Sequence, residues 1–505
     1  MNARTHAGHP TIAGRALAAM AGALAAIALL PAAAPAAPSQ PTMVQDDPEL
    51  TRSTPEHRAV RLDELKGIGV DIVKVRIDWR DLAPSPTATS KPSGFNGEDP
   101  AEYPEVKWRP YDDVLRAIVA RGMTPYVMLG GRAPTWASAS DGVTRPDPAE
   151  FGRFVKAVGT RYSGGFAGIY FDPMSPLPRI GLWAVWNEPN LANWLKPQYQ
   201  GSRPVSPHVY RGLLYAARDA LQASGHGDDQ LLIGELLPSA RASQERVKVR
   251  PIRFLRELAC VDSKYRPLTG SSAKARGCDT FSPLPGTGLA YHPYTLAGGP
   301  DVRSSSKDDA SIAELSRVTS ALDKLSKRGR LAATKMPIWI SEFGFQTDPP
   351  DPFQSTLSRV PGYMAHSEWL AYRNPRVAAY SQYPLVDDPV GKSGSNRYGG
   401  FQSGLRFQDG KAKPGVYAGF ERTLFVKLRS SKSVELFGAV RAAAAGQDVV
   451  LEQRRGSKGS FRALRTVKTG AQGYFRLVAK ISSPTKRQYR FRVGNRASRK
   501  ATAHR

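Results

Sequence analysis

The sequence predicts an α/β protein in which a (β/α)8 TIM barrel is followed by a small all-β, sandwich-like domain. Between residues 42 and 420, short apolar runs rich in β-branched residues alternate with segments whose apolar residues recur at helical spacing. Repeated units of this kind predict a parallel sheet covered by helices. After about residue 421 the helical spacing ends, and short alternating runs separated by turns predict antiparallel strands.

The first clear βα unit shows both patterns. Ile72–Ile77 reads IVKVRI, a run typical of a strand. The helix expected after it carries apolar residues at the spacing of a half-buried helix, namely Tyr111, Val114, Leu115, Ile118 and Val119. The other barrel strands are expected near residues 125–129, 180–185, 231–233, 289–291, 338–340 and 378–383, with a weaker first strand at 43–44.

Eight such units over residues 42–420 suit a closed barrel with long loops. An open, doubly wound sheet is the alternative. It predicts a glycine-rich phosphate loop after the first strand, and the sequence contains none there.

The second domain is expected over residues 421–496, with strands near 434–440, 448–453, 461–467, 473–478 and 489–493, and residues 497–505 are expected to be a disordered tail.

The chain has a net charge of +27, and residues 421–505 hold 21 Lys and Arg against 4 Asp and Glu. For an exported protein this basicity favours anionic cell-wall polymers over nucleic acid as a partner. A solvated basic surface without a dedicated partner stays open. We also expect this domain to be separable from the barrel.

Residues 1–37 are predicted to be a secretory signal peptide. Arg4 and Arg15 precede the apolar run 16–30, and small residues and prolines follow it. That run is short for a membrane span, although an uncleaved anchor remains the alternative. We therefore expect a secreted protein with no transmembrane segment in the mature chain.

The two cysteines of the chain, Cys260 and Cys278, are expected to form a disulfide, as is common outside the cytoplasm.

Two glutamates follow two different predicted strands. Glu188 stands in WNEPN after the run 180–185, and Glu342 stands in SEFGF after the run 338–340. Because the carboxyl ends of barrel strands meet at one rim, we expect the two side chains to face each other there. A protonated and an ionised carboxyl group on either side of a bond are the equipment for cleaving a glycosidic linkage.

These two segments resemble the fourth- and seventh-strand signatures of the clan A glycoside hydrolases, which include cellulase-like and β-xylosidase-type families. The resemblance covers about residues 42–420. It implies a retaining β-glycoside hydrolase with Glu188 as acid/base and Glu342 as nucleophile. It also implies that Asn187 hydrogen-bonds the sugar 2-hydroxyl. The substrate class implied is a poly- or oligosaccharide.

Supporting residues are assigned by the same resemblance. In YHPY after the sixth strand, Tyr294 matches the residue that orients the nucleophile, and His292 lines the site. Arg76 matches the second-strand arginine that keeps the nucleophile ionised, or else pairs with Asp78. A buried His and Tyr bonded only to backbone groups remain the plain alternative for His292 and Tyr294.

Sugar rings pack their C–H faces on aromatic side chains, so tryptophans in rim loops are candidate platforms. Many clan members carry a tryptophan on the eighth strand, whereas this sequence has Gln382 and Tyr383 there, either of which can replace it. Glu235 is a third carboxylate at the rim, without the clan context of a catalytic group. The tryptophan candidates are Trp79, Trp136 and Trp194.

Neither a metal nor another cofactor is predicted, because the sequence has no cluster of His residues and no calcium-loop motif. The main alternative to the enzyme is a non-catalytic carbohydrate-binding surface protein on a barrel scaffold. A purely structural surface protein is disfavoured by the carboxylate pair. The sugar, the linkage, endo or exo action and the oligomeric state are not encoded in these motifs, because a fold does not determine a substrate.

Overall fold

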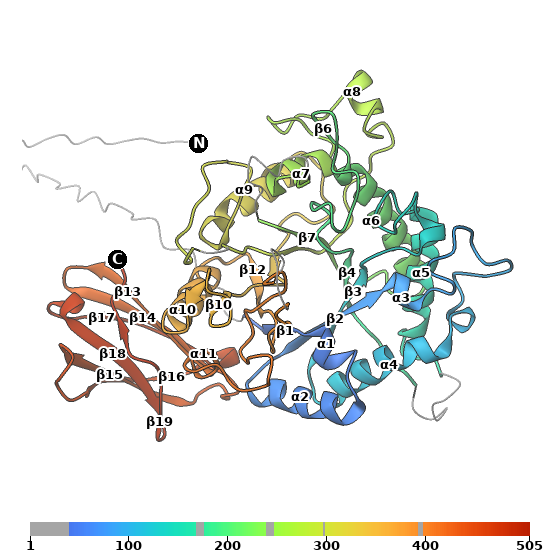
Figure 1. Ribbon diagram of the computed structural model, residues 1–505. Coiled ribbons are helices and arrows are strands. Elements are labelled where there is room, and N and C mark those ends of the chain that lie inside the picture. The colour runs from blue at the N-terminus through green and yellow to red at the C-terminus, as the bar shows by residue number, and fades with distance from the viewer. Residues whose placement is uncertain (1–39, 168–175, 239–246, 296–297, 392–396) are drawn as a thin grey trace, which may run out of the picture. The chain divides into compact units, whose positions relative to one another are not determined.

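The computed structural model describes residues 40–167, 176–238, 247–295, 298–391 and 397–505 (Figure 1). The predicted signal peptide, residues 1–37, lies outside the described residues. Within the described ranges, no helix is both long and apolar enough to cross a bilayer.

Eight parallel strands close into a barrel in the order β1-β12-β9-β8-β7-β4-β3-β2 (Figure 1). This confirms the predicted fold class, which is the fold that the clan A resemblance implies. The strands are β1 (Thr42–Gln45), β2 (Ile72–Asp78), β3 (Thr124–Gly130), β4 (Leu182–Val185), β7 (Gln230–Leu236), β8 (Gly288–Tyr291), β9 (Ile338–Ile340) and β12 (Val377–Gln382).

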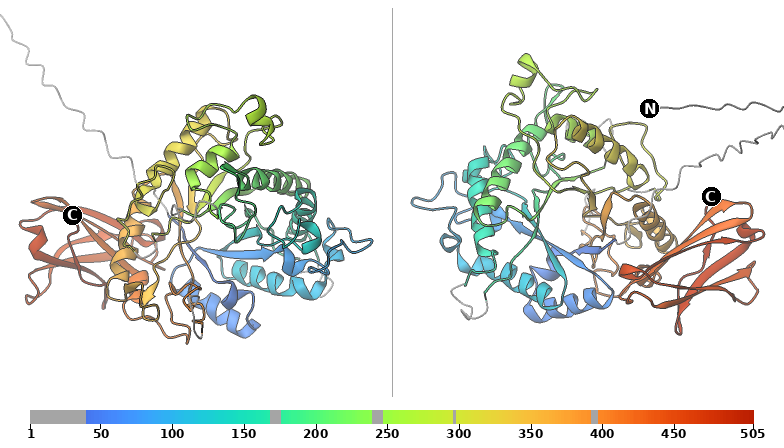
Figure 2. Two further views of the ribbon diagram at one scale, coloured as in Figure 1. Left: turned by 45° about the horizontal axis from the view of Figure 1, so that its top comes forward. Right: turned by 180° about the vertical axis from the view of Figure 1, so that it is seen from behind.

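Helices connect these strands and cover the outside of the barrel (Figure 2). In α4, Trp108, Tyr111 and Ile118 are buried as the helical spacing predicts, whereas Val119 is 43% exposed. The main helices are α2 (Pro55–Gly67), α4 (Glu105–Ala120), α5 (Pro148–Arg161), α6 (Ser206–Ala223), α7 (Pro251–Leu258), α9 (Leu315–Lys327) and α10 (Val360–Tyr372). Shorter elements are α1 (Asp47–Leu50), α3 (Trp79–Leu82), α8 (Gly270–Lys274), α11 (Val416–Glu421), and the two-stranded pairs β5 (Tyr199–Gln200) with β6 (Arg203–Pro204) and β10 (Thr347–Asp348) with β11 (Ser355–Thr356).

The interior of the barrel has an apolar floor under a charged layer. The floor is a cluster of inward-facing side chains that includes Met43, Ile72, Tyr126, Met128, Leu182, Ala184, Leu232, Ala290 and Ala379. Because side chains alternate along a strand, Ile72 and Lys74 face the same side of β2, and Lys74 lies one step closer to the strand's carboxyl end. The charged groups of the barrel therefore lie above a buried apolar layer.

Cys260 and Cys278 form a disulfide between β7 and β8, with Cα atoms 5.7 Å apart. The predicted pairing is confirmed. It closes the segment that contains α8, in the connection that leads to β8.

The C-terminal domain contains two antiparallel sheets (Figure 1). One consists of β13 (Arg422–Ser430), β14 (Ser433–Val440) and β17 (Tyr474–Lys480), and the other of β15 (Asp448–Arg455), β16 (Arg462–Lys468), β18 (Arg487–Val493), β19 (Arg496–Ala497) and β20 (Ala501–Thr502).

The predicted disordered tail at residues 497–505 is wrong. β19 and β20 both pair with β18, and the amide of Leu428 donates to the carbonyl of His504 at 2.7 Å. The tail is held by backbone hydrogen bonds, which its charged, low-hydrophobicity sequence does not reveal.

The sheet β13-β14-β17 packs on α10 of the barrel. Trp369 of α10 belongs to one buried apolar cluster with Phe425, Phe437 and Tyr474 of the sheet. Arg441, which follows β14, donates to the Glu368 carboxylate at 2.6 Å, and the Tyr474 hydroxyl donates to the same oxygen at 2.6 Å. Glu368 and Arg441 are both buried. The second domain thus shares a core with the barrel, which argues against the simple separability expected from its sequence.

We predict that Glu368→Ala lowers the free energy of unfolding by about 3–5 kcal/mol, because it leaves the buried Arg441 guanidinium without its carboxylate. Denaturant unfolding measures this change. The matched control is Asp448→Ala, which removes an exposed pair with Lys468 at 2.9 Å and should change stability little. Equal effects of the two substitutions would show that the pair at α10 does not join the domains.

Candidate active site

The carboxyl ends of four neighbouring strands bring the candidate catalytic residues together. Glu188 follows β4, Glu235 lies in β7, His292 directly follows β8 and Glu342 follows β9. All four residues are buried, and none is more than 8% exposed. The strands β4, β7, β8 and β9 are adjacent in the barrel, so residues far apart in the sequence meet at one rim.

The backbone at this rim adopts conformations that non-glycine residues rarely occupy. Trp186, Glu188 and Glu235 have φ angles of 66°, 40° and 48°. Gly130, at the end of β3, makes room for this turn, because a Cβ there would lie 2.9 Å from the Trp186 ring. Strained residues of this kind persist where the surrounding structure fixes them, and they concentrate at functional sites.

Glu188 and Glu342 face each other across His292. One side-chain ligand atom from each of the three residues lies within 4.8 Å of those of the other two. His292 Nδ1 lies 2.9 Å from Glu188 Oε1 and 3.6 Å from Glu342 Oε2. The Tyr294 hydroxyl donates to Glu342 Oε2 at 3.4 Å. His292 and Tyr294 therefore stand where the sequence places them, next to the glutamate pair.

Lys74 is the cation that contacts the predicted nucleophile. Its Nζ lies 3.1 Å from Glu342 Oε1 and 2.9 Å from Glu235 Oε2, and the side chain is fully buried. Of the two roles that the sequence leaves open for Arg76, the structure shows the pair with Asp78, with 3.7 Å between Arg76 Nε and Asp78 Oδ2.

Glu235 is the centre of a second group of contacts behind the pair. It accepts hydrogen bonds from the Ser341 hydroxyl at 2.7 Å and from the Tyr126 hydroxyl, and it pairs with His292 Nε2. His292 is thus held between Glu188 on one ring nitrogen and Glu235 on the other. Glu235 orients the histidine and the lysine, a role that its position in the sequence did not indicate.

Burial and the neighbouring charges set the protonation states. Burial raises the pKa of Glu188, and the Glu342 charge adds to this, while His292 opposes it. Burial acts to lower the pKa of His292, but the carboxylates around it outweigh burial and raise it to about 9. For Glu235, Lys74 and His292 together outweigh burial and lower the pKa. The Lys74 pKa is raised because its two carboxylate partners outweigh burial.

The net charge of the buried site depends on how many of its carboxyl groups are protonated. Two cations, Lys74 and His292, face the three carboxyl groups of the site. The group is neutral when one of the three carboxyls carries a proton. Of the three, Glu188 is the carboxyl group whose pKa burial raises, so it is the one that most favours this proton. The site can therefore present one acid and one carboxylate at the same time.

Asn187 offers an unused acceptor at the site. Its side-chain Oδ1 is buried and makes no hydrogen bond with any residue that the structure describes. Nearby, Asn190 donates from Nδ2 to the carbonyls of Leu237 and Val249 at 3.1 and 3.0 Å, which fixes the loop after β4. A buried polar group without a partner carries a free-energy cost that a ligand can relieve.

The other predicted contact residues fall into two sets. Arg76 lies over the Trp194 ring at 5.4 Å, and Tyr383 packs edge-on against Phe401, which also contacts Tyr294. Arg76, Trp194 and Tyr383 thus lie around the mouth of the barrel, and the charges of Glu342 and Arg76 both act on the Tyr383 hydroxyl.

Trp136 belongs to a loop core instead. Its indole donates to the Pro84 carbonyl at 3.2 Å, and its ring contacts Trp79 and Phe95. Trp79 is 1% exposed, so it is packing rather than a platform. Gln382 donates to the Ser403 carbonyl at 2.7 Å, which directs its amide into the protein.

Lys74, Ser341 and Tyr126 are the contacts that sequence reasoning missed. A lysine inside the β-branched run IVKVRI is a usable signal, because a charged side chain facing the interior of a barrel needs a partner there. The triad Glu188, His292 and Glu342 has enough ligand atoms for a metal ion. The ammonium of Lys74 is already paired with the Glu342 carboxylate, which disfavours the binding of a second cation there.

No protein-family model matches the chain, and no curated protein matches it. Solved structures are similar to it. β-Glucuronidase 2 of Bacteroides uniformis is 9% identical, with 92% of this chain and 46% of that chain covered and a TM-score of 0.42. The chain thus spans about half the length of that protein.

Two further structures cover 76% of this chain. The exo-β-1,4-mannosidase of Opitutaceae bacterium strain TAV5 is 16% identical, with 58% of that chain covered and a TM-score of 0.43. The GH5_18 protein of Streptomyces cattleya in complex with GlcNAc is 15% identical, with 80% of that chain covered and a TM-score of 0.46. At such low identities and TM-scores, these likenesses do not indicate what this chain acts on.

Proposed function

We propose that the chain is a secreted retaining β-glycoside hydrolase that cleaves poly- or oligosaccharides through a covalent glycosyl-enzyme. The observation that carries the proposal is the spacing of Glu188 and Glu342, whose nearest ligand atoms lie within 4.8 Å. Carboxyl groups about 5–5.5 Å apart are typical of retaining enzymes, whereas inverting enzymes need about 6.5–9.5 Å to admit a water.

In the first step, the Glu342 carboxylate attacks the anomeric carbon while Glu188 gives its proton to the departing glycosidic oxygen. The carbon–oxygen bond breaks, and the sugar is left bonded to Glu342 with inverted configuration. In the second step, the Glu188 carboxylate takes a proton from water, the water oxygen displaces Glu342, and the β configuration returns.

The surrounding charges support both steps. Lys74 and Tyr294 hold the Glu342 carboxylate in place through contacts at 3.1 and 3.4 Å, which limits its rotation before attack. His292 contacts both catalytic carboxyl groups. When the negative charge of Glu342 is consumed by the sugar, the charge that disfavours ionised Glu188 disappears. Glu188 then loses its proton more easily and is ready to act as the base.

Asn187 is placed to bind the sugar hydroxyl next to the reacting carbon. Its Oδ1, which has no partner among the described residues, is an acceptor inside a buried site. A hydrogen bond from the 2-hydroxyl strengthens as positive charge develops at the anomeric carbon, so it favours the transition state over the bound substrate.

The non-catalytic binding protein remains the alternative. The buried charge balance favours the enzyme, because a protonated glutamate and a buried ammonium are costly features that sugar binding alone does not need.

For the C-terminal domain we propose binding to anionic cell-wall polymers. Strand β16 presents Arg462, Arg465 and Lys468, which are all exposed, and Lys468 pairs with Asp448 at the surface. Next to it, the guanidinium groups of Arg454 and Arg490 lie 4.7 and 4.2 Å from the centre of the Phe461 ring. Cationic groups around an aromatic ring suit a chain of anionic sugars or phosphates.

We predict opposite stereochemistry when azide rescues the two catalytic variants. In Glu188→Ala, an activated aryl β-glycoside still forms the intermediate, and azide replaces water without needing a base, so the product is the β-glycosyl azide. In Glu342→Ala, azide enters from the vacated face and gives the α-glycosyl azide. Product configuration is read by NMR. The control Glu102→Ala removes an exposed carboxyl group and should behave as the wild type. Swapped products would reverse the two roles.

We predict that kcat/KM falls as pH rises through the raised pKa of Glu188. The acid must be protonated in the free enzyme, and burial shifts this loss to a higher pH than the ordinary carboxyl value of 4.5. With an activated aryl glycoside, Glu188→Ala should lack this basic limb. A limb that remains near pH 9 reports His292, whose pKa is about 9. An unchanged limb well below pH 9 in Glu188→Ala would contradict the assignment.

We predict that Lys74→Met lowers kcat/KM by about 10²–10³-fold, the scale on which removal of one preorganised electrostatic partner acts. The acid limb of the pH profile should also move to higher pH, because Glu235 loses the cation that helps to lower its pKa. The double variant Lys74→Met with Glu235→Gln restores charge balance and should recover part of the loss. Additive losses in this double-mutant cycle would mean that the two residues act independently.

We predict that binding of the full chain to an anionic polysaccharide weakens as salt rises, because screening acts on exposed charges. The triple variant Arg462→Gln, Arg465→Gln and Lys468→Gln should bind more weakly and with a smaller salt dependence. Sedimentation with an insoluble form of the polymer measures the bound fraction. Binding that ignores ionic strength would rule out the electrostatic role.

A further inference from the structure

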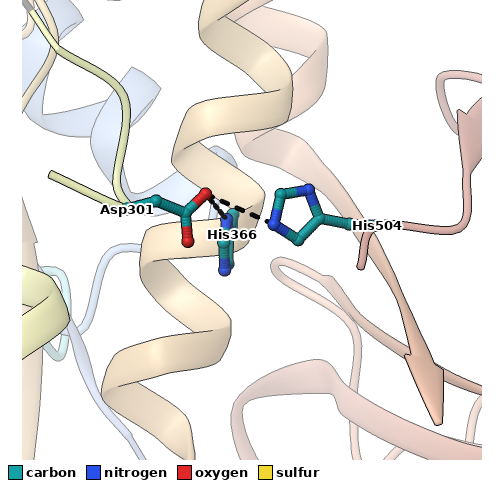
Figure 3. Close-up of side chains that lie close together, drawn as sticks. All are labelled: Asp301, His366 and His504. Carbon is teal, nitrogen blue, oxygen red and sulfur yellow. Dashed lines mark ion pairs between the residues drawn. The ribbon is translucent and has the colours of Figure 1, made fainter.

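A second cluster of ligating side chains lies away from the active site, where the barrel meets the C-terminal strand. Asp301 comes from the loop after β8, His366 from α10 and His504 from the segment after β20 (Figure 3). Each offers one ligand atom, and the three atoms lie within 4.8 Å of one another. We propose that this cluster is a binding site for a divalent transition metal such as Zn²⁺, which fastens the C-terminal strand to the barrel.

The distances fit a shared metal better than direct hydrogen bonds. Asp301 Oδ2 lies 3.3 Å from His504 Nε2 and 3.7 Å from His366 Nδ1. Direct charge-assisted N–H···O bonds are about 2.7–2.9 Å long, so these contacts are too long. Zinc bonds of about 2.0–2.2 Å to His nitrogen and Asp oxygen place neighbouring ligands of a tetrahedron roughly 3.3–3.6 Å apart.

Both imidazoles are already held in place. The His366 ring stacks on Phe425 with centroids 4.3 Å apart and planes 8° apart, and the residue is only 5% exposed. His504 is fixed through its backbone, since its amide donates to the carbonyl of Val426 at 2.8 Å. Among the described residues, neither ring has a hydrogen bond to another side chain or to the backbone, and Asp301 is the carboxylate that both face (Figure 3).

The surroundings leave space for an ion and its water. The three residues line a cavity of about 660 Å³. Two cations nearby are engaged by other groups. Arg499 donates to the Leu424 carbonyl at 2.6 Å, and Lys427 lies over the Trp369 ring at 5.9 Å. Two histidines, one carboxylate and a water form a ligand set that zinc accepts with tetrahedral geometry.

The site has a structural consequence. Its ligands come from three segments that are distant in the sequence, and one of them is the C-terminal strand. A metal that binds only the folded arrangement stabilises it by mass action. The segment at residues 501–504, which contains β20, should therefore open less often when metal is bound.

Isothermal titration of the chelator-treated full-length protein with ZnCl₂ tests the proposal, and hydrogen exchange at residues 501–504 follows the strand. One ion should bind per chain and slow exchange there. Asp301→Asn and His504→Asn, whose positions are partly exposed, should weaken binding by at least about 10–100-fold, because loss of a ligand exceeds the effect of losing a residue that orients one. Co²⁺ should give visible absorption bands that these variants lack.

Two controls separate this site from other histidines and carboxylates. His57→Asn removes an exposed histidine whose Nε2 lies 2.8 Å from Glu49 Oε2 and which has no second imidazole beside it among the residues that the structure describes, so Zn²⁺ binding should be unchanged. Glu342→Gln should also bind Zn²⁺ as the wild type does. Loss of binding in Glu342→Gln would place the ion in the active site and overturn the proposal. Absence of saturable binding, or equal binding by the Asp301 and His504 variants, would overturn it as well.

Discussion

The buried contact between Lys74 and two glutamates is the constraint on which the active site depends. A lysine ammonium without exposure is stable only if carboxylates surround it, and here Glu235 and Glu342 both lie within 3.1 Å of its Nζ. Glu235 also holds His292, which in turn contacts Glu188. Removal of any member leaves another charge unpaired, so the catalytic carboxyl groups are fixed in position and protonation by one connected network.

The barrel makes this network possible through alternation and adjacency. Lys74 faces inward because it lies two residues from Ile72, whose side chain belongs to the apolar floor. Strands β7, β8 and β9 are neighbours, so Glu235, His292 and Ser341 reach one another without long side chains. The left-handed backbone of Glu188 and Glu235 then aims two carboxyl groups at the same histidine. In the low dielectric above the floor, each of these contacts is stronger than it would be in water.

The features that could be predicted from the sequence are those that depend on residues close together in the chain. The strand runs, the alternating C-terminal segments and the two glutamate motifs are local patterns, and the strand pairing confirms the barrel that they predict. The role of Lys74 depends on the register of β2 against the other strands, which no local pattern reports. The family resemblance points to Arg76 and leaves its partner open, while the alternation along β2 puts Lys74 deeper in the barrel.

Contacts between distant segments could not be predicted from local sequence patterns for the same reason. His366 and His504 are far apart in the sequence, so no His cluster is visible until α10 and the last strand lie side by side. The tail was expected to be disordered because it is short and basic, yet its backbone pairs with β18 and β13. The contact of Glu368 with Arg441 likewise needs both domains folded.

The central claim is that Glu342 forms a covalent bond to the sugar while Glu188 does not. Incubation of the protein with a 2-deoxy-2-fluoro aryl glycoside of the sugar that it hydrolyses, followed by digestion and mass spectrometry, tests this directly, because the fluorine slows the second step and lets the intermediate accumulate. The account predicts one label per chain, on the peptide that contains Glu342. A label on the peptide with Glu188 or Glu235, or hydrolysis that gives the inverted sugar with no label, would contradict it.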